Sequence, residues 1–422
     1  MMSRKLTAKP HASRIALALA GGGPLGAIYE IGALCAMEES LTGLDFTQLD
    51  HYVGVSAGGF IAAGLANGIT PRELCASFIE NDQAAADVFD PEWLMQPAYD
   101  EFARRAVMLP GLMVNALWQY TVRRQSLTRA LEGLSPSLPT GMFSNEGIHH
   151  RLAKLFSQPG RTNDFRQLKT RLTLVATQLD SGEAAPFGEP GWDHVPISRA
   201  VQASAAMPGL FPPVEIDDKY FVDGALKKTM HASVAMDEGA DLVICLNPLV
   251  PFNATQPGIG DKAPALKDRI PKIVDGGLPS VLNQTFRSMI HSRMALGMKH
   301  YERAYPNTDI VLIEPDRRDP EMYLANTFSY SQRRHLAEHA YQQTRVALRT
   351  DQGGMVSKLA GHGIHLRQGV LNDPRRHLIA PSVPSTKVGK ALGRLQRTLD
   401  ELEVFAQIGH TAYSPSLVPK AR

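Results

Sequence analysis

The stretch 54–58 reads Gly-Val-Ser-Ala-Gly and is the part of this chain that points most clearly to chemistry. It fits Gly-x-Ser-x-Gly, a sharp turn from a strand into a helix that exposes a nucleophilic serine. Apolar residues at 49–53 precede the motif and an alanine-rich segment follows it, so we expect a strand before the turn and a helix after it. Gly54 and Gly58 bring no side chains into a tightly folded backbone. The pattern therefore predicts that Ser56 is a nucleophile.

A second glycine-rich segment lies between an apolar run at 14–20 and a helical pattern at 27–39. Its glycines are Gly21, Gly22, Gly23 and Gly26. This Gly-x-Gly-x-x-Gly spacing also occurs in dinucleotide-binding turns, but those require an acidic residue at the end of the next strand. Asp45 has the right distance from the loop, yet it lies in a polar stretch outside any strand pattern. We therefore predict an oxyanion hole, in which backbone amides at a helix N-terminus stabilise the charge of a tetrahedral intermediate.

A serine nucleophile needs a base to accept its proton, and histidine is the usual one. The chain has 14 histidines, but none of them lies in an obviously privileged turn. Residues 219–225 instead predict a short strand that ends in Asp223, Gly224 and Ala225, where a carboxylate could point into a crevice above a sheet. On local sequence alone an ordinary Asp-Gly hairpin turn is the better interpretation. Aspartate is also a weak base, so it would serve only close to Ser56 and in a dry site.

In this order, the three motifs resemble those of the patatin-like phospholipases. Two further stretches, at 176–183 and 203–214, are similar to that family, and the resemblance extends over residues 14–247. It implies a three-layer α/β/α fold with a mostly parallel central sheet, to which the patterns at 80–145 and after residue 353 add a helical insertion and a C-terminal helical extension. It also implies a dyad in which Ser56 is the nucleophile and Asp223 the general base, with no metal and no organic cofactor.

Residue by residue, the resemblance assigns the oxyanion hole to the glycine-rich loop after residues 14–20, at Gly21, Gly22, Gly23 and Gly26. Gly22 and Gly23 would provide most of it. The motif residues that support the two catalytic positions are Gly54, Gly58, Gly224 and Ala225. One residue departs from the family pattern. Leu25 stands where members often have arginine or lysine, which leaves the headgroup preference open.

The expected function is that of a serine hydrolase that cleaves fatty-acyl esters of lipids, as a phospholipase A, a lysophospholipase or an esterase does. One alternative is a Ser-His-Asp esterase, whose base would be among His149, His150, His231 and His291. Another is a protein that binds lipid on the same fold without cleaving it. A third is transfer of the acyl group to an acceptor other than water.

We expect three regions along the chain. A catalytic core would occupy 14–250 and include a helical cap or lid at 80–145. Residues 251–350 would complete the domain with helices, and 351–422 would form a tail with one amphipathic helix at about 386–407. The leucines of that helix alternate at spacings of four and three, so it could pack on the core or join two copies of the chain.

Composition and charge narrow the expected partners. The net charge of the 422 residues is +2, too small for global attraction to nucleic acid. Three widely spaced cysteines fit a reducing, cytoplasmic compartment. We predict neither a signal peptide nor a transmembrane helix. Between residues 102 and 131 there are five arginines and no acidic residue, which fits peripheral contact with an anionic inner-membrane surface and equally fits a helical cap that packs on the core with its arginines solvated.

Overall fold

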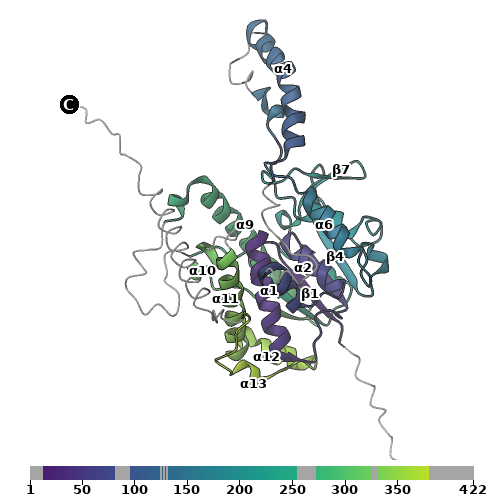
Figure 1. Cartoon of the computed structure of the whole chain (residues 1–422), viewed down its shortest axis with the longest axis vertical. Helices are drawn as coiled ribbons and strands as arrows, with labels where there is room; N and C mark the ends of the chain where they lie inside the picture. The colour runs from purple at the N-terminus through teal and green to yellow at the C-terminus, as the bar shows by residue number, and fades with distance from the viewer. Residues whose placement is uncertain are drawn as a thin grey trace, which may run out of the picture.

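The computed structural model describes residues 13–80, 96–123, 126, 129, 132–253, 272–324 and 330–379. Within these residues a central sheet is covered by helices on both faces, and one long helix projects away from the body (Figure 1). The first part of the expected insertion, at 81–95, and the expected amphipathic helix at 386–407 lie outside the described residues.

The central sheet has eight strands in the order β6-β7-β4-β3-β1-β8-β9, and β5 also pairs with β4. The strands are β1 (Ile15–Leu19), β3 (His51–Val55), β4 (Arg171–Gln178), β5 (Ala184–Phe187), β6 (Val214–Ile216), β7 (Lys219–Asp223), β8 (Leu242–Leu246) and β9 (Asp309–Ile313). Strands β4, β3, β1, β8 and β9 are parallel, whereas β5, β6 and β7 pair in antiparallel fashion. A separate short pair joins β2 (Leu41–Thr42) to β10 (His365–Leu366). The expectation of a mostly parallel sheet is confirmed.

Along the chain, the helices of the described residues lie between and after the strands of this sheet. They are α1 (Gly23–Ser40), α2 (Ala57–Ala66), α3 (Pro71–Cys75), α4 (Tyr99–Thr121), α6 (Glu146–Phe156), α7 (Ile197–Ser204), α8 (Ser233–Asp237), α9 (Gly277–Ala304), α10 (Pro320–Leu324), α11 (Tyr330–Arg349), α12 (Met355–Gly361) and α13 (Gln368–Leu371). Helices α9 and α11 lie within residues 251–350, the region for which the sequence predicts helices.

Strand β1 explains why the fold has three layers. Successive strand residues point to opposite faces of a sheet. Leu17 and Leu19 belong to a large apolar core with α1, α2 and α11, whereas Ala16 and Ala18 belong to a smaller core with residues of α8 and α9. All four side chains are fully buried. A strand that is apolar on both faces needs helices on both faces, and the α/β/α expectation is met.

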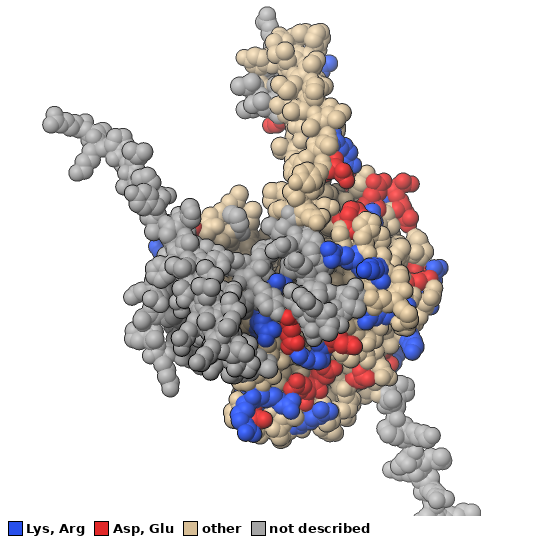
Figure 2. Space-filling model, in the orientation of Figure 1, with Lys and Arg blue, Asp and Glu red and all other residues tan. Residues whose placement is uncertain are grey.

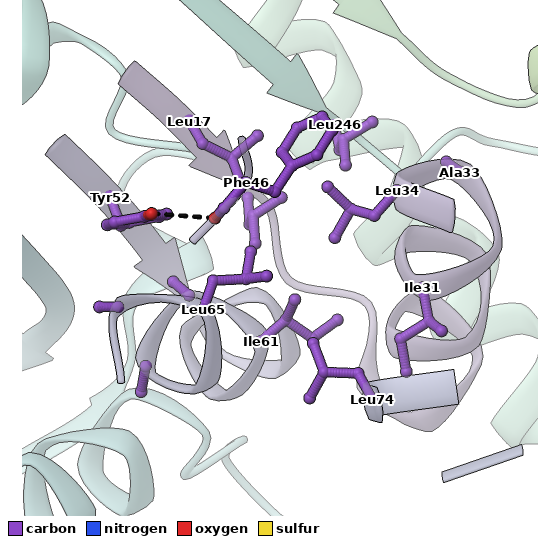
Figure 3. Close-up of a cluster of buried hydrophobic side chains, with 14 of the residues drawn as sticks. Leu17, Ile31, Ala33, Leu34, Phe46, Tyr52, Ile61, Leu65, Leu74 and Leu246 are labelled. Carbon is purple, nitrogen blue, oxygen red and sulfur yellow. Dashed lines mark hydrogen bonds between the residues drawn. The ribbon is translucent and has the colours of Figure 1, made fainter. Parts of the chain in front are cut away.

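The larger core holds the first half of the sheet against α1 and α2. Figure 3 shows Leu17 of β1, Leu34 of α1 and Ile61 of α2 in one cluster of buried side chains. Tyr52 is fully buried in the same cluster. Its hydroxyl still has a partner there, because it donates a hydrogen bond of 2.9 Å to the carbonyl oxygen of Phe46. The two turns that follow β1 and β3 are thus held by a continuous apolar core.

Helix α4 leaves this body and is fixed at its base by one buried carboxylate. Glu101 accepts hydrogen bonds from Arg104, from Arg105 at 2.9 Å and from the hydroxyl of Thr140 at 2.8 Å. Burial raises the pKa of Glu101, but these hydrogen bonds outweigh it and lower the pKa to about 2. The carboxylate therefore stays charged and ties the first turn of α4 to the body.

Two features of the fold differ from the sequence patterns. Helix α1 begins at Gly23 rather than at Ala27, because Pro24 in the first turn has a backbone angle suited to a helix start. Strands β5 and β6 are not predicted at all. They contain four and three residues, too few for an alternating pattern to stand out.

The packing of α1 against α11 gives a test of the fold. A Cβ at Gly32 would lie 2.4 Å from the carbonyl oxygen of Ala337. We expect Gly32→Ala to lower the free energy of unfolding by about 1–3 kcal/mol, because the two helices must separate, even though alanine favours helix. A Cβ at Gly297 of α9 would meet nothing within 4 Å, so Gly297→Ala should raise stability by about 0.5–1 kcal/mol. Urea unfolding followed by circular dichroism measures both, and equal effects would contradict the prediction.

Candidate active site

Ser56 occupies a strained turn between β3 and α2. Its φ of 54° and ψ of −124° are unusual for a residue with a side chain. A Cβ at Gly54 would lie 2.5 Å from the Cα of Gly59, so the turn cannot close with a larger residue there. The predicted strand, turn and helix are all present around Ser56. This geometry lifts the serine hydroxyl above the end of the sheet.

Gly58 brings this turn into contact with the turn after β1. Its amide donates a hydrogen bond of 3.2 Å to the carbonyl oxygen of Ala20, and a Cβ there would lie 2.5 Å from the same oxygen. On the other side of this turn, a Cβ at Gly21 would lie 3.0 Å from the Cβ of Ser56. The two glycine-rich motifs of the sequence therefore touch each other at Ser56.

Ser204, at the end of α7, links the strained turn at Ser56 to strand β4 by hydrogen bonds. Its hydroxyl donates to the carbonyl oxygen of Val175 at 2.6 Å and accepts from the amide of Ser56 at 2.8 Å. Without the Ser204 hydroxyl, the buried amide of Ser56 would lose its hydrogen-bond partner. The sequence analysis missed this residue. Its one signal is a hydroxyl among the small apolar residues of 203–214, a stretch that was noted only for its resemblance.

Strand register brings Asp223 to the level of Ser56. Val55 pairs with Val175 of β4, and the next residue of β4, Ala176, pairs with Asp223 of β7. Ser56, one residue beyond Val55, thus lies level with Asp223 on the other side of β4. The predicted strand that ends in an acid is present, and it pairs with β6 in a hairpin whose turn lies at 217–218 rather than at Asp223.

The carboxyl group of Asp223 is buried beside the serine. The residue is 2% exposed and Ser56 is 6% exposed. Asp223 Oδ1 accepts from the amide of Ala225 at 2.9 Å, whereas no hydrogen-bond partner of normal geometry is found for Oδ2 among the described residues. Burial raises the pKa of Asp223 to about 6, although the Ser56 hydroxyl and the Ala225 amide each lower it. The effect of the Ser56 hydroxyl on this pKa places the serine close to the carboxyl group, whose Oδ2 is the oxygen without a partner.

Gly224 and Ala225 support that carboxyl through the backbone. A Cβ at Gly224 would lie 2.1 Å from the carbonyl oxygen of Val175, so only glycine fits between β7 and β4. The Cβ of Ala225 lies 3.5 Å from the position that a Cβ at Gly21 would take. Small residues at these positions allow the acid, the serine and the loop to meet.

The loop after β1 presents backbone amides to the same place. Gly23 starts α1 with a φ of 60°, and a Cβ there would meet nothing within 4 Å, because it faces the pocket. Cβ atoms at Gly22 and Gly26 would each lie 3.0 Å from Pro248, so these two glycines set how closely the loop packs. In the described part of the chain, the amides of Gly22 and Gly23 have no acceptor. Such amides at a helix N-terminus can receive negative charge.

An apolar pocket of about 180 Å³ opens above these groups. Ser56, Asp223 and Gly23 all line it. Its walls are largely apolar and include Ile28, Ile31, Phe60, Phe78, Met207 and Leu210. A site with these walls suits a hydrocarbon chain and keeps water from the carboxyl group.

The histidines offered as alternative bases are His149, His150, His231 and His291, and none of them is among the described residues that line this pocket. His149 Nδ1 instead lies 3.0 Å from the hydroxyl of Ser198. His231 is buried, with Nε2 at 3.4 Å from the carbonyl oxygen of Gly224, and burial lowers its pKa to about 4. His231 is thus neutral and contacts the backbone beside Asp223, not the serine.

Comparison with known proteins gives one matching family model and two similar solved structures. Residues 17–236, just over half of the chain, match the family model described as patatin-like phospholipase. Two solved structures are similar at low identity. The crystal structure of VipD from Legionella pneumophila is 15% identical, with a TM-score of 0.33 over 84% of this chain and 74% of that one. The crystal structure of type III effector protein ExoU is 16% identical, with a TM-score of 0.26 over 97% of this chain and 68% of the other.

The burial of Asp223 predicts an unusual pH dependence of stability. Its pKa is about 6 in the native state and near 4 in the unfolded chain, so the native state binds more protons between these values and loses stability as pH rises through them. Above pH 6 this penalty is complete and on the order of 2–3 kcal/mol. An asparagine at this position would carry no charge to desolvate. We therefore expect Asp223→Asn to be more stable than the wild type at pH 8, with the difference vanishing toward pH 4.

Urea unfolding at several pH values measures this difference. Asp218→Asn is the matched control, because Asp218 is an exposed residue of the same hairpin and should show no such trend. A variant Asp223→Asn that is less stable than the wild type at pH 8 would contradict the prediction.

Proposed function

Since this chain belongs to the patatin-like phospholipase family, we propose that it hydrolyses lipid acyl esters with Ser56 as nucleophile and Asp223 as general base. The observation that carries the proposal is the meeting of a strained serine and a buried carboxyl group at the base of one apolar pocket. Acyl-ester substrates have an apolar chain for such a pocket and a carbonyl for such a serine.

The first chemical step forms an acyl-enzyme. Ser56 Oγ attacks the carbonyl carbon while its proton passes to Asp223 Oδ2, and the carbonyl oxygen becomes an oxyanion. The amides of Gly22 and Gly23 stabilise that charge, each such donor contributing roughly 3 kcal/mol in acyl transfer. The tetrahedral intermediate then breaks the ester bond, and the leaving alcohol takes the proton from Asp223.

The second step releases the fatty acid. Asp223 accepts a proton from water, whose oxygen attacks the acyl carbon and forms a second oxyanion in the same place. The bond to Ser56 Oγ breaks, and the proton returns from Asp223 to the serine. Because one carboxyl group serves both steps, no histidine is needed, and a raised pKa makes Asp223 a stronger base than an ordinary aspartate.

Activity measurements test this dyad. We expect Ser56→Ala and Asp223→Asn each to lower fatty-acid release from lysophosphatidylcholine by at least about 1,000-fold with folding intact. The kcat/KM of the wild type should fall below pH 6, where Asp223 becomes protonated and cannot act as a base. A rate that survives Asp223→Asn would contradict the dyad.

A fluorophosphonate probe separates the alternatives. It should label the wild type at Ser56 and fail to label Ser56→Ala. Loss of labelling in one of the four histidine-to-alanine variants alone would favour the Ser-His-Asp alternative. Absence of labelling in folded wild-type protein would favour lipid binding without hydrolysis.

We also propose that the enzyme reaches its substrate at a bilayer surface, through the arm formed by α4. From Ala106 to Thr121 the arm has no charged side chain. Its large apolar side chains are nevertheless exposed, with Val107 at 81%, Leu117 at 63% and Trp118 at 56%. Figure 2 shows this arm projecting with few charged residues along it. A run of exposed, large apolar side chains like this one is typical of contact with a membrane or a partner.

The dimensions of the arm favour insertion into one leaflet. Sixteen helical residues are about 24 Å long, shorter than the hydrocarbon core of a bilayer. Among the described helices, none has an apolar stretch sufficient to cross a membrane. Of the five arginines in this segment, Arg104 and Arg105 bind Glu101 at the base of the arm. Arg123 and Arg129 are exposed beyond α4, and Arg124 lies outside the described residues. Apolar contact rather than charge therefore supports membrane binding.

Vesicle sedimentation tests the arm. Replacing Val114, Leu117 and Trp118 together by glutamine should weaken binding to phosphatidylglycerol vesicles by at least about tenfold, since each buried apolar side chain contributes on the order of 1.5–3 kcal/mol. Leu179→Gln is the control, because Leu179 is 52% exposed but lies in the turn after β4. Equal sedimentation of the triple variant and the control would contradict the role of α4.

A further inference from the structure

Strand β9 forms one edge of the central sheet, because β8 is the only strand that pairs with it in the described part of the chain. The amide of Asp309, its first residue, donates a hydrogen bond of 2.9 Å to Asp241 at the start of β8. The residues of a parallel strand direct their N–H and C=O groups to one side and the other in turn. Those of Ile310 and Leu312 therefore point away from β8.

A groove of about 500 Å³ follows this open edge. All five residues of β9 line it, between the end of α9 and the segment around α12. Lys358 of α12 donates a hydrogen bond of 2.9 Å to the carbonyl oxygen of Ile310. Within the described residues, the amides of Ile310 and Leu312 and the carbonyl oxygen of Leu312 have no hydrogen-bond partner. Unpaired backbone groups along an open groove are a template for one more strand.

The charge of this groove favours a basic occupant. The charged side chains among the described residues that line it are three acids and one lysine, namely Glu302, Asp309, Glu314 and Lys358. The twelve residues before Ser13 have the opposite character, with no acidic residue and three basic ones, Arg4, Lys5 and Lys9. Charge complementarity of this kind guides two surfaces together and favours one register between them.

Ser13 lies at one end of the groove. Its hydroxyl is 3.0 Å from Nδ1 of His362, and Nε2 of the same ring is 3.0 Å from a carboxylate oxygen of Asp309. One imidazole ring thus separates Ser13 from the first residue of β9. Five strand residues extend over about 17 Å, whereas twelve extended residues span up to about 40 Å. Residues 1–12 are therefore long enough to follow the whole of β9 from Ser13.

We propose that residues 1–12, the N-terminal segment, bind along β9 as one further antiparallel strand of the central sheet. The direction follows from Ser13, because a strand that ends beside the start of β9 must run against it. The backbone of the segment pairs with Ile310 and Leu312, and its basic side chains approach the acids of the groove. Pro10 has no N–H, so its nitrogen faces away from β9. The contact covers an edge that could otherwise pair with a second copy of the chain.

Hydrogen exchange at the two edges of the sheet tests this contact and needs no enzymatic activity. Mass spectrometry follows deuterium uptake in peptides that cover β9 and, as the control, β6 at the opposite edge. Deleting residues 2–12 should speed exchange at Ile310 and Leu312 by about tenfold or more, because a hydrogen-bonded amide exchanges only when its bond opens. Exchange in β6 should not change. A synthetic peptide of residues 1–12, added to the deletion variant, should slow exchange in β9 again.

Charge variants test the same contact with the chain length unchanged. Lys5→Glu together with Lys9→Glu should speed exchange in β9, whereas Lys5→Arg together with Lys9→Arg should leave it slow. Glu302→Lys, on the side of the groove, should act in the same direction as the charge reversal. Exchange in β9 that is the same with and without residues 2–12 would overturn the proposal. Slow exchange that survives this deletion but is lost on dilution, or on removal of 380–422, would assign the groove to a second copy or to the C-terminal tail instead.

Discussion

The candidate site depends on backbone contact between two strand-to-helix turns. The amide of Gly58 donates to the carbonyl oxygen of Ala20, and no side chain fits at that contact. Neighbouring parallel strands produce it, because β1 and β3 each pass the chain to a helix at the same edge of the sheet. The turn after β1 carries the loop amides and the turn after β3 carries Ser56. The contact that requires glycine therefore also places these amides beside Ser56.

The antiparallel part of the sheet brings in the acid Asp223, which the parallel pair β1 and β3 does not provide. Strand β4 continues past the level of Ser56, and β7 pairs with that extension through Phe221, Val222 and Asp223. Because β7 runs against β4, it approaches from beyond the edge and ends at the level of the serine. The chain then enters a 3-10 turn at Gly224, whose missing side chain lets β7 approach Val175. An acid is thus delivered by a short hairpin instead of a long crossover connection.

Much of the candidate site could be predicted from sequence where the residue types that matter lie together in one local pattern. The turn at Ser56 and the glycine loop have glycines at positions that only glycine fits, and apolar runs mark their strands. Asp223 was ambiguous, since its pairing with Ala176 depends on register across three strands, which no local pattern encodes. Ser204 was missed for the same reason, because its partners, Val175 and the amide of Ser56, are distant in sequence.

In the proposed mechanism, substrate recognition and the strength of Asp223 as a base have a common physical origin. The walls that accept an acyl chain exclude water from Asp223, and that desolvation is the main cause of its raised pKa. A better-solvated aspartate would hold its charge more easily and accept a proton less readily. The same walls strengthen the pull of loop amides on an oxyanion, since charges interact more strongly where water is absent. Strain at Ser56 and burial of Asp223 each cost folding free energy, and the core beneath the two turns must offset both. A polar group introduced into the pocket would therefore weaken catalysis as well as binding, even without touching the serine or the acid.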